Sequence, residues 1–390
     1  MAKLRRGEGA FATRAIHEGE HPDPTTRAHN TPIHMTATFT FETGEEKEAA
    51  VDGALAWDPG NFFYSRTGNP TTAALETKLA SLESAEDAVV GSSGMAAVAS
   101  LVHSLVHAGD HLLVSNDIFV ISRVLLVDDL PRRGVEVSAV DVTDLDAVRA
   151  AIRPNTRALF TEVMSNPLMR IADIPALAAI ARERGIRLLV DNTFLSPYLY
   201  RPLEDGADAV LHSATKYLAG HGDALAGVVA GSKELIDGVR YQLDALGGAA
   251  SPFNAWLVLR GVRTLPLRME AHSRNGLVLA EAFESHPAVA WVRYPGLPSH
   301  PDAAVADRLL GPARGGMMTV KVRGDAREMY AFTNATRLCS IGVSLGDLYT
   351  LIYPNPKRGD VIRVSTGCEA IEDIVADVRA ALDAVPLPVG

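Results

Sequence analysis

The feature that most constrains the fold is an alternation of short apolar runs with helical patterns between residues 61 and 257. Residues 112–114 and 187–190 are apolar runs without polar alternation, which is typical of strands buried on both faces. Residues 177–184 have helical spacing. Chains of this kind form a mainly parallel sheet covered by helices. We therefore predict an α/β domain over residues 61–257.

The rest of the chain lacks this alternation. Residues 1–60 are rich in Pro and Thr, with short strand-like runs such as 36–40, and we predict an N-terminal arm that contacts a neighbouring subunit. Residues 258–390 mix helical patterns with apolar runs, which predicts a smaller α+β C-terminal domain. Beyond Ser251, helices are expected at 254–260, 266–285 and 371–382, and strands at 317–322 and 361–364.

Two charged residues follow apolar runs of the predicted sheet. Asp191 comes directly after the run 187–190, and Lys216 lies just beyond the run 209–212. Ligands bind at the carboxyl ends of parallel strands, so both side chains are expected to face one crevice. A partly buried lysine can form a Schiff base with an aldehyde, and a carboxylate can keep a pyridine nitrogen protonated. The pair predicts pyridoxal phosphate as the cofactor, although either residue alone is more typical of a surface or a turn.

A Gly/Ser turn supplies a third part of this site. Residues 91–95, Gly-Ser-Ser-Gly-Met, follow the apolar run 88–90 and precede the helical pattern 96–102. The free amides and the positive dipole end of such a helix bind phosphate. The hydroxyls of Ser213 and Thr215 precede the lysine and suit the same group. The turn lacks the spacing of a P-loop or of a dinucleotide-binding turn, which argues against a nicotinamide-dependent dehydrogenase.

Composition excludes several classes of function. The net charge is −10 and no long basic stretch occurs, so no nucleic-acid partner is expected. No run of membrane-spanning length and no apolar stretch behind the charged N-terminus occurs, so we expect neither a membrane association nor a signal peptide. Cys339 and Cys368 are the only cysteines, so a disulfide framework is not expected. Such low cysteine use predicts a reducing compartment, and we therefore expect a cytoplasmic location. The twelve histidines lack metal-ligand spacing, and no metal is predicted.

Nearly the whole chain resembles the Cys/Met-metabolism family of pyridoxal-phosphate enzymes, which contains methionine and cystathionine γ-lyases, cystathionine γ-synthases and homoserine-ester sulfhydrylases. The motifs that carry the resemblance are residues 63–71, 91–95, 165–167, 191–193, 213–223, 344–347 and 363–367. The resemblance implies the fold-type-I transferase fold of pyridoxal-phosphate enzymes. It also implies a homo-oligomer, expected to be a dimer of dimers, whose active sites are shared between subunits.

The same resemblance implies roles for individual residues. Lys216 would hold the cofactor as a Schiff base and carry protons between the α, β and γ carbons of the substrate, while Asp191 would pair with the pyridinium nitrogen. Arg363 would bind the carboxylate of the amino-acid substrate, with Ser344 beside it. The other implied contacts of the cofactor are Ser213, Thr215 and the amides of Gly94 and Met95 on its phosphate, Tyr64 and Arg66 of a neighbouring subunit on the same phosphate, and Asn166 on its phenolic oxygen.

Three features depart from the family pattern and bear on the substrate. Phe119 stands where the family usually has tyrosine; its ring can stack on the cofactor but cannot donate a proton, so Tyr64 or Lys216 would do so, or the leaving group departs unassisted. Val343 stands where members that handle cystathionine tend to have glutamate, which favours an apolar substrate tail. The segment that leads to Arg363 is short, which predicts a more open site or one completed by another surface.

These expectations predict a pyridoxal-phosphate lyase that carries out γ-elimination on a sulfur amino acid, most like methionine γ-lyase or cystathionine γ-lyase. Methionine would give methanethiol, 2-oxobutanoate and ammonia. The alternatives are a γ-replacement enzyme of the cystathionine γ-synthase or sulfhydrylase type, a specialised biosynthetic γ-elimination enzyme, and a cofactor-binding oligomer with little catalysis. The sequence leaves these open, because the choice depends on water access and on the lifetime of the reacting species.

Overall fold

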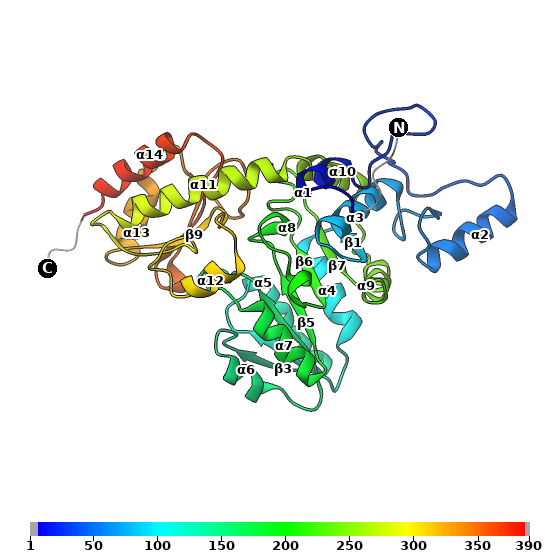
Figure 1. Ribbon diagram of the computed structural model, residues 1–390, viewed down its shortest axis with the longest axis horizontal. Coiled ribbons are helices and arrows are strands. Elements are labelled where there is room, and N and C mark those ends of the chain that lie inside the picture. The colour runs from blue at the N-terminus through cyan, green and yellow to red at the C-terminus, as the bar shows by residue number, and fades with distance from the viewer. Residues whose placement is uncertain (1–6, 387–390) are drawn as a thin grey trace.

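The larger sheet holds the predicted strands. The structure, a computed structural model, describes residues 7–386, and its seven-stranded sheet has the order β1-β7-β6-β5-β4-β2-β3 (Figure 1). The strands are β1 (Asp87–Gly91), β2 (His111–Ser115), β3 (Glu136–Val140), β4 (Thr156–Glu162), β5 (Arg187–Asp191), β6 (Ala209–His212) and β7 (Gly227–Gly231). Strands β2 to β6 pair in parallel, whereas β7 runs antiparallel between β1 and β6. The predicted α/β class with a mainly parallel sheet is confirmed.

Helices cover both faces of this sheet. On one face, Phe160 and Leu189 join α4 and α9 in one apolar cluster; on the other, Leu159 and Leu188 join α3, α7 and α10 in a second. Because successive strand residues point to opposite faces, the unbroken apolar runs fill both clusters. The helices of this region are α3 (Pro70–Leu82), α4 (Gly94–Leu105), α5 (Val120–Arg123), α6 (Leu145–Ala151), α7 (Ile174–Arg184), α8 (Ser196–Leu199), α9 (Lys233–Leu246) and α10 (Pro252–Val262), with short turns η1 (Val124–Asp129), η2 (Leu130–Arg133) and η3 (Pro202–Asp205).

A second sheet forms the C-terminal part, with the order β10-β11-β12-β9-β8. Its strands are β8 (Val289–Arg293), β9 (Met317–Val322), β10 (Ser340–Ile341), β11 (Leu351–Asn355) and β12 (Val361–Ser365), and its helices are α11 (Leu265–Glu284), α12 (Ala303–Leu309), α13 (Ala326–Ala335) and α14 (Ile371–Asp383), with a short turn η4 (Pro356–Arg358). Phe283 of α11, Phe332 of α13 and Val378 of α14 pack with Val320 and Val364 of the sheet. The expected mixture of helices and separate strands at this end is therefore present.

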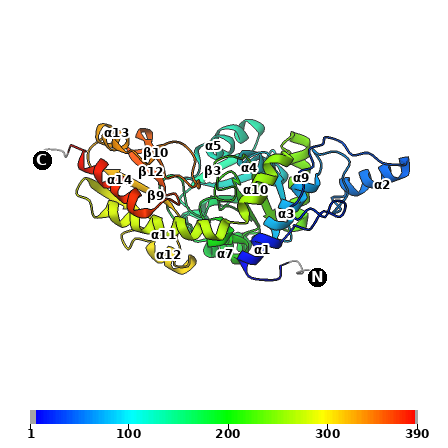
Figure 2. The same cartoon turned by 90° about the horizontal axis from the view of Figure 1, so that it is seen from above.

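The N-terminal segment is more helical than its Pro/Thr-rich sequence indicated. It contains α1 (Phe11–His17) and α2 (Gly44–Leu55), and the strand-like run at 36–40 forms only one bridge, between Thr38 and Tyr64. Helix α2 begins after Thr43, whose side chain accepts from the Glu46 N–H, and it buries only Ala54. A helix with so little apolar surface gives no periodic signal. Figures 1 and 2 show α2 at the end of the molecule opposite to α13 and α14.

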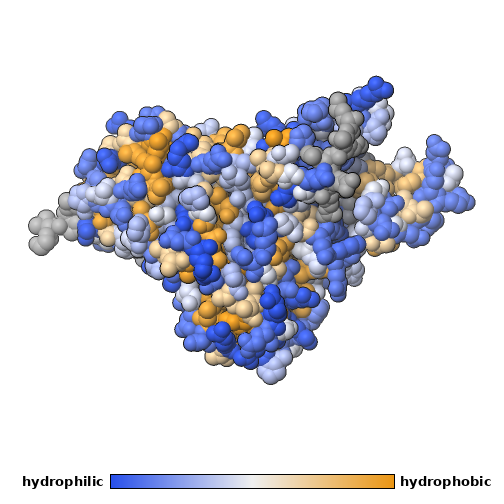
Figure 3. Space-filling model, viewed as in Figure 1, coloured by the Kyte–Doolittle hydropathy of each residue, from blue (hydrophilic) through white to orange (hydrophobic). Residues whose placement is uncertain are grey.

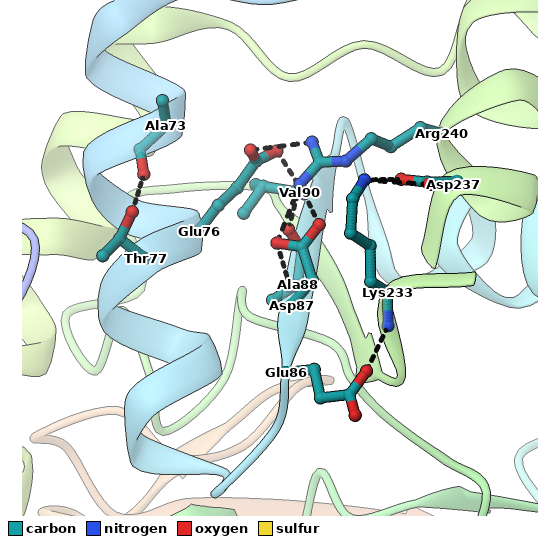
Figure 4. Close-up of polar contacts among 10 residues, drawn as sticks. All are labelled: Ala73, Glu76, Thr77, Glu86, Asp87, Ala88, Val90, Lys233, Asp237 and Arg240. Carbon is teal, nitrogen blue, oxygen red and sulfur yellow. Dashed lines mark hydrogen bonds and ion pairs between the residues drawn. The ribbon is translucent and has the colours of Figure 1, made fainter. Parts of the chain in front are cut away.

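An arginine on α9 joins three elements around β1. Arg240 contacts Glu76 of α3 at 2.9 Å, Asp87 at 3.1 Å and the Ala88 carbonyl oxygen at 2.6 Å (Figure 4). Burial raises the pKa of the Glu76 carboxyl, against the opposing charge of Arg240. This ion pair therefore fixes α9 and α3 on the strand that leads into the Gly/Ser turn.

The predicted limit at residues 257/258 falls inside α10. The three domain ranges stay a prediction. On the face shown in Figure 3, polar residues are widespread and apolar patches lie between them. No helix between residues 7 and 386 is both long and apolar enough to span a bilayer.

Candidate active site

Lys216 lies in the loop between β6 and β7. Its Nζ donates a 2.7 Å hydrogen bond to Oγ of Ser344, which belongs to the segment between β10 and β11. Backbone bonds from the Lys216 N–H to Ser213 and from the Gly220 N–H to Lys216 fix the turn. Burial, and next the charge of Arg363, lower the pKa of the Lys216 amine to about 8. A useful fraction of this amine is unprotonated near neutral pH, as a nucleophile or base requires.

Arg363 lies on β12 and brings the two sheets together. Its Nη2 donates to the Ser344 carbonyl oxygen at 2.9 Å, and its Nη1 donates to Oδ1 of Asn166 at 3.3 Å. Its guanidinium carbon lies 5.3 Å from the ring centroid of Tyr353, its register partner on β11. Hydrogen bonds thus join one group of four residues, Lys216, Ser344, Arg363 and Asn166. The lysine and the arginine are its cations.

Asp191 ends β5, at the edge of the larger sheet where β6 leads into the Lys216 loop. Its Oδ1 accepts from the Thr193 N–H at 2.9 Å and from the Thr193 hydroxyl at 2.5 Å. The Thr193 Oγ1 also accepts from the Ser213 N–H at 2.8 Å, which links the ends of β5 and β6. Burial raises the pKa of the Asp191 carboxyl, against the hydrogen bonds from Thr193 that lower it. Asp191 is therefore joined through Thr193 to Ser213, where the Lys216 loop begins.

Glu162 is a residue of this edge that the sequence interpretation missed. It ends β4, is the register partner of Asp191, and is only 7% exposed. One carboxyl oxygen accepts from the Phe119 N–H at 2.7 Å, and the other accepts from the Asn166 N–H at 3.0 Å. The signal was present, because an acidic residue ends the apolar run of β4 just as Asp191 ends that of β5.

The Gly/Ser turn lies beside the Lys216 loop. Helix α4 begins at Gly94, and the side chain of Ser93 caps it by accepting from the Ala96 N–H at 3.1 Å. A Cβ on Gly94 would lie 2.9 Å from the Cβ of Ser213, so only glycine fits there. The Thr215 Oγ1 contacts the backbone of Ala226 at 3.1 and 3.2 Å. The neighbouring Met95 accepts a contact from Ser122 at 3.8 Å through its sulfur.

Tyr64 and Arg66 are not brought to this group within one chain. The Arg66 Nε bonds Oδ1 of Asp244 on α9 at 2.6 Å, and its guanidinium carbon lies 5.2 Å from the Tyr64 ring centroid. Arg66 and Asp244 line a cavity of about 190 Å³ together with Trp57. Among the described residues, neither side chain has a hydrogen bond or ring contact with Lys216. The placement is compatible with the expected donation of both to a neighbouring subunit.

Phe119 and Val343 flank the group and are open to solvent. Phe119 caps α5 and is 37% exposed, and Val343 precedes Ser344 and is 72% exposed. Ser344 itself has φ of +88°, a left-handed conformation that is strained for a residue with a side chain. The segment before Arg363 forms a tight hairpin of β11 and β12, in agreement with its short sequence.

These side chains fit the predicted cofactor. The lysine with a lowered pKa suits the aldehyde of pyridoxal phosphate, and the buried carboxyl of Asp191 suits its ring nitrogen. The N-terminus of α4, which tolerates no Cβ at Gly94, suits its phosphate. Within residues 7–386, no three His, Cys, Asp or Glu side chains are grouped so that they could hold a metal ion.

Comparison with known proteins agrees with this fit. Residues 12–383 match the model of the family described as Cys/Met metabolism PLP-dependent enzyme. The chain is 41% identical to an L-methionine γ-lyase of Porphyromonas gingivalis over 99% of this chain and 100% of that protein. It is 40% identical to a cystathionine γ-synthase of Mycobacterium bovis over 97% and 98% of the two. The crystal structure of metB from Corynebacterium glutamicum shares 35% identity and a TM-score of 0.91 over 97% of this chain and 99% of that one. The chain therefore belongs to the Cys/Met-metabolism family of pyridoxal-phosphate-dependent enzymes.

Proposed function

We propose that this protein is a pyridoxal-phosphate-dependent carbon–sulfur lyase that removes the γ substituent of a sulfur amino acid, with methionine as the leading substrate. The observation that carries the proposal is the group formed by Lys216, Ser344 and Arg363, in which a base with a pKa of about 8 lies beside a buried guanidinium. The relatives named methionine γ-lyase support the choice of reaction.

In the proposed course, the chain positions the substrate and moves its protons. Arg363 binds the α-carboxylate of the amino acid through its guanidinium fork. The bound cofactor supplies an electron sink for the bonds that break beside the substrate amine. Once the substrate amine has displaced it, the Lys216 Nζ is free to take the proton from the α carbon. It would give that proton up to the aldehyde carbon of the bound cofactor before it takes one from the β carbon, so that the γ substituent leaves. Asp191 supplies the negative charge for the ring nitrogen.

The apolar residues at the open side of the site support a substrate with an apolar tail. Val343 offers no charge to a distal ammonium group, and Phe119 offers an aromatic face without a proton to donate. A thiolate leaves without full protonation more readily than an alkoxide does, so a sulfur substituent suits a site in which Phe119 has no acid. Tyr64 of a neighbouring subunit is the proposed alternative acid.

The proposed assembly is a homo-oligomer, arranged as a dimer of dimers. The support is that Arg66 bonds Asp244 on α9 and lies over the ring of Tyr64, and that neither side chain has a hydrogen bond or ring contact with Lys216 among the described residues. We further propose a cytoplasmic location, supported by Cys339 and Cys368, which are both free thiols.

The second candidate is γ-replacement, in which a nucleophile takes the place of the leaving group. The specific observation in its favour is the 40% identity to a cystathionine γ-synthase over nearly the whole chain. The two reactions would use the same Lys216, Asp191 and Arg363. They differ in whether a second substrate or water reaches the bound amino acid first after the γ substituent has left.

A substrate panel separates the candidates. The holoenzyme is given methionine, cystathionine, homocysteine, cysteine and acylated homoserines, with and without an added thiol, and keto acid and thioether products are measured. Keto acid from methionine without an added thiol supports the lyase. Thioether formation from acylated homoserine supports γ-replacement, and no product from any member contradicts both. The variant K216A controls for contaminating enzymes.

A further inference from the structure

Glu162 has contacts that go beyond those of a strand-end carboxyl. Its two oxygens accept from the backbone N–H groups of Phe119, at 2.7 Å, and Asn166, at 3.0 Å. Phe119 carries the ring proposed to stack on the cofactor, and Asn166 contacts Arg363 at 3.3 Å. A single buried side chain therefore joins the segment of Phe119 to the segment of Asn166.

Glu162 also shares a sheet face with Asp191. The two are register partners on the parallel strands β4 and β5. Two residues earlier, Phe160 and Leu189 are register partners and belong to the same apolar cluster, so Glu162 and Asp191 point to that same side. Burial, and next the charge of Asp191, raise the pKa of the Glu162 carboxyl well above its usual value.

The other charged groups around Glu162 come from three further elements. Asp117, in the loop after β2, disfavours its ionised form, and Arg363 on β12 faces it with the opposite charge. Arg170 and Glu162 both line a cavity of about 170 Å³ at the ends of β2 and β4. That cavity is polar, since Asp117 and Asp141 also line it.

We propose that Glu162 is a positioning residue of the cofactor site, which holds the backbone of Phe119 and of Asn166 in register with Asp191. It acts through these residues and needs no contact with the substrate. The proposal rests on the cofactor site and not on which amino acid reacts, so its failure would leave the proposed γ-elimination untouched.

The test compares E162Q with D377N. Glutamine keeps the size of the side chain but replaces one acceptor oxygen by an NH₂ group, which faces an N–H donor. Asp377 on α14 is a matched control, because its carboxylate also accepts from backbone amides, those of Arg337, Leu338 and Cys339, away from the site. Far-ultraviolet circular dichroism checks the fold of each variant.

Two measurements are made on protein freed of cofactor and titrated with pyridoxal phosphate. We expect E162Q to raise the Kd by about tenfold, because one of the two backbone N–H groups loses its acceptor. We also expect E162Q to change the visible circular dichroism of the bound cofactor, because displaced neighbours alter its asymmetric surroundings. D377N is expected to leave both unchanged.

The proposal is overturned if E162Q binds the cofactor with the wild-type Kd and the wild-type visible spectrum, or if D377N produces the same changes. If E162Q does not fold, E162D is measured instead. Aspartate keeps both carboxyl oxygens but shortens the reach by one methylene, so a raised Kd and an altered spectrum are again expected, and wild-type values overturn the proposal.

Discussion

The Lys216 amine donates a 2.7 Å hydrogen bond to the hydroxyl of Ser344, and Ser344 has a backbone φ of +88°. A strained residue from the C-terminal part thus holds the free end of the lysine from the larger sheet. Strain of this kind persists where the surrounding structure enforces it, and it is concentrated at functional sites.

Replacing Ser344 separates strain from function. S344G removes the penalty of the left-handed conformation and S344A keeps it, so we expect S344G to be more stable than S344A by about 1 kcal/mol. Urea denaturation measures the difference. Both variants lose the hydroxyl, so both are expected to show the same reduced rate of substrate turnover. Equal stabilities of the two variants would show that the conformation carries no strain.

The reactivity of Lys216 is expected to follow its lowered pKa. In cofactor-free protein the amine becomes increasingly protonated as the pH falls below its pKa, so its acylation should rise with pH through a midpoint near the pKa of about 8. The variant R363M removes a positive charge that lowers this pKa, so its midpoint should move to higher pH. Mass spectrometry of the Lys216 peptide after brief acylation gives both midpoints. A midpoint that R363M does not move, or moves downward, contradicts the assignment.

Shared active sites can be tested by mixing two inactive variants. K216A lacks the lysine and R66A lacks the proposed phosphate ligand from the partner. If the site is shared, a mixed dimer has one site with both residues intact, and random mixing of equal amounts restores roughly a quarter of wild-type activity. The mixture is unfolded and refolded together to exchange subunits. Activity that stays at the level of the separate variants would place Arg66 in the site of its own chain or outside both.

The ion pair of Arg240 is expected to stabilise the larger sheet. R240A leaves the carboxyl of Glu76, 13% exposed, without its cation, which should lower the free energy of unfolding by about 3 kcal/mol. Lys233 on the same helix pairs with Asp237 in an exposed position and serves as the control, so K233A should cost less than about 1 kcal/mol (Figure 4). Urea denaturation of both variants checks this. Similar losses for the two would contradict the role of burial.

The sequence predicted the parts of the site that follow from strand ends. Asp191 and Lys216 follow apolar runs, and parallel strands bring their carboxyl ends to one edge, so their proximity could be inferred. The same rule applies to Glu162, which was overlooked because it belongs to none of the motif residues considered. The expected helix at 254–260 corresponds to α10, and the expected strand at 317–322 corresponds to β9. Both could be predicted because their apolar residues follow a local pattern.

Other features depend on tertiary structure and leave no local pattern. The stacking of Arg363 on Tyr353 depends on the register of β11 and β12, and the φ of Ser344 depends on the contacts of both sheets. The antiparallel direction of β7 is likewise set by its neighbours β1 and β6, since its residues are as apolar as those of a parallel strand.

The most direct test of the site is to trap the cofactor on the protein. The holoenzyme is reduced with borohydride and digested, and the peptides are weighed and sequenced by mass spectrometry. We predict that the phosphopyridoxyl group is found on Lys216 and that K216A carries none. A phosphopyridoxyl group on another lysine, or none on the wild-type protein saturated with cofactor, would contradict the assignment of Lys216 and the mechanism built on it.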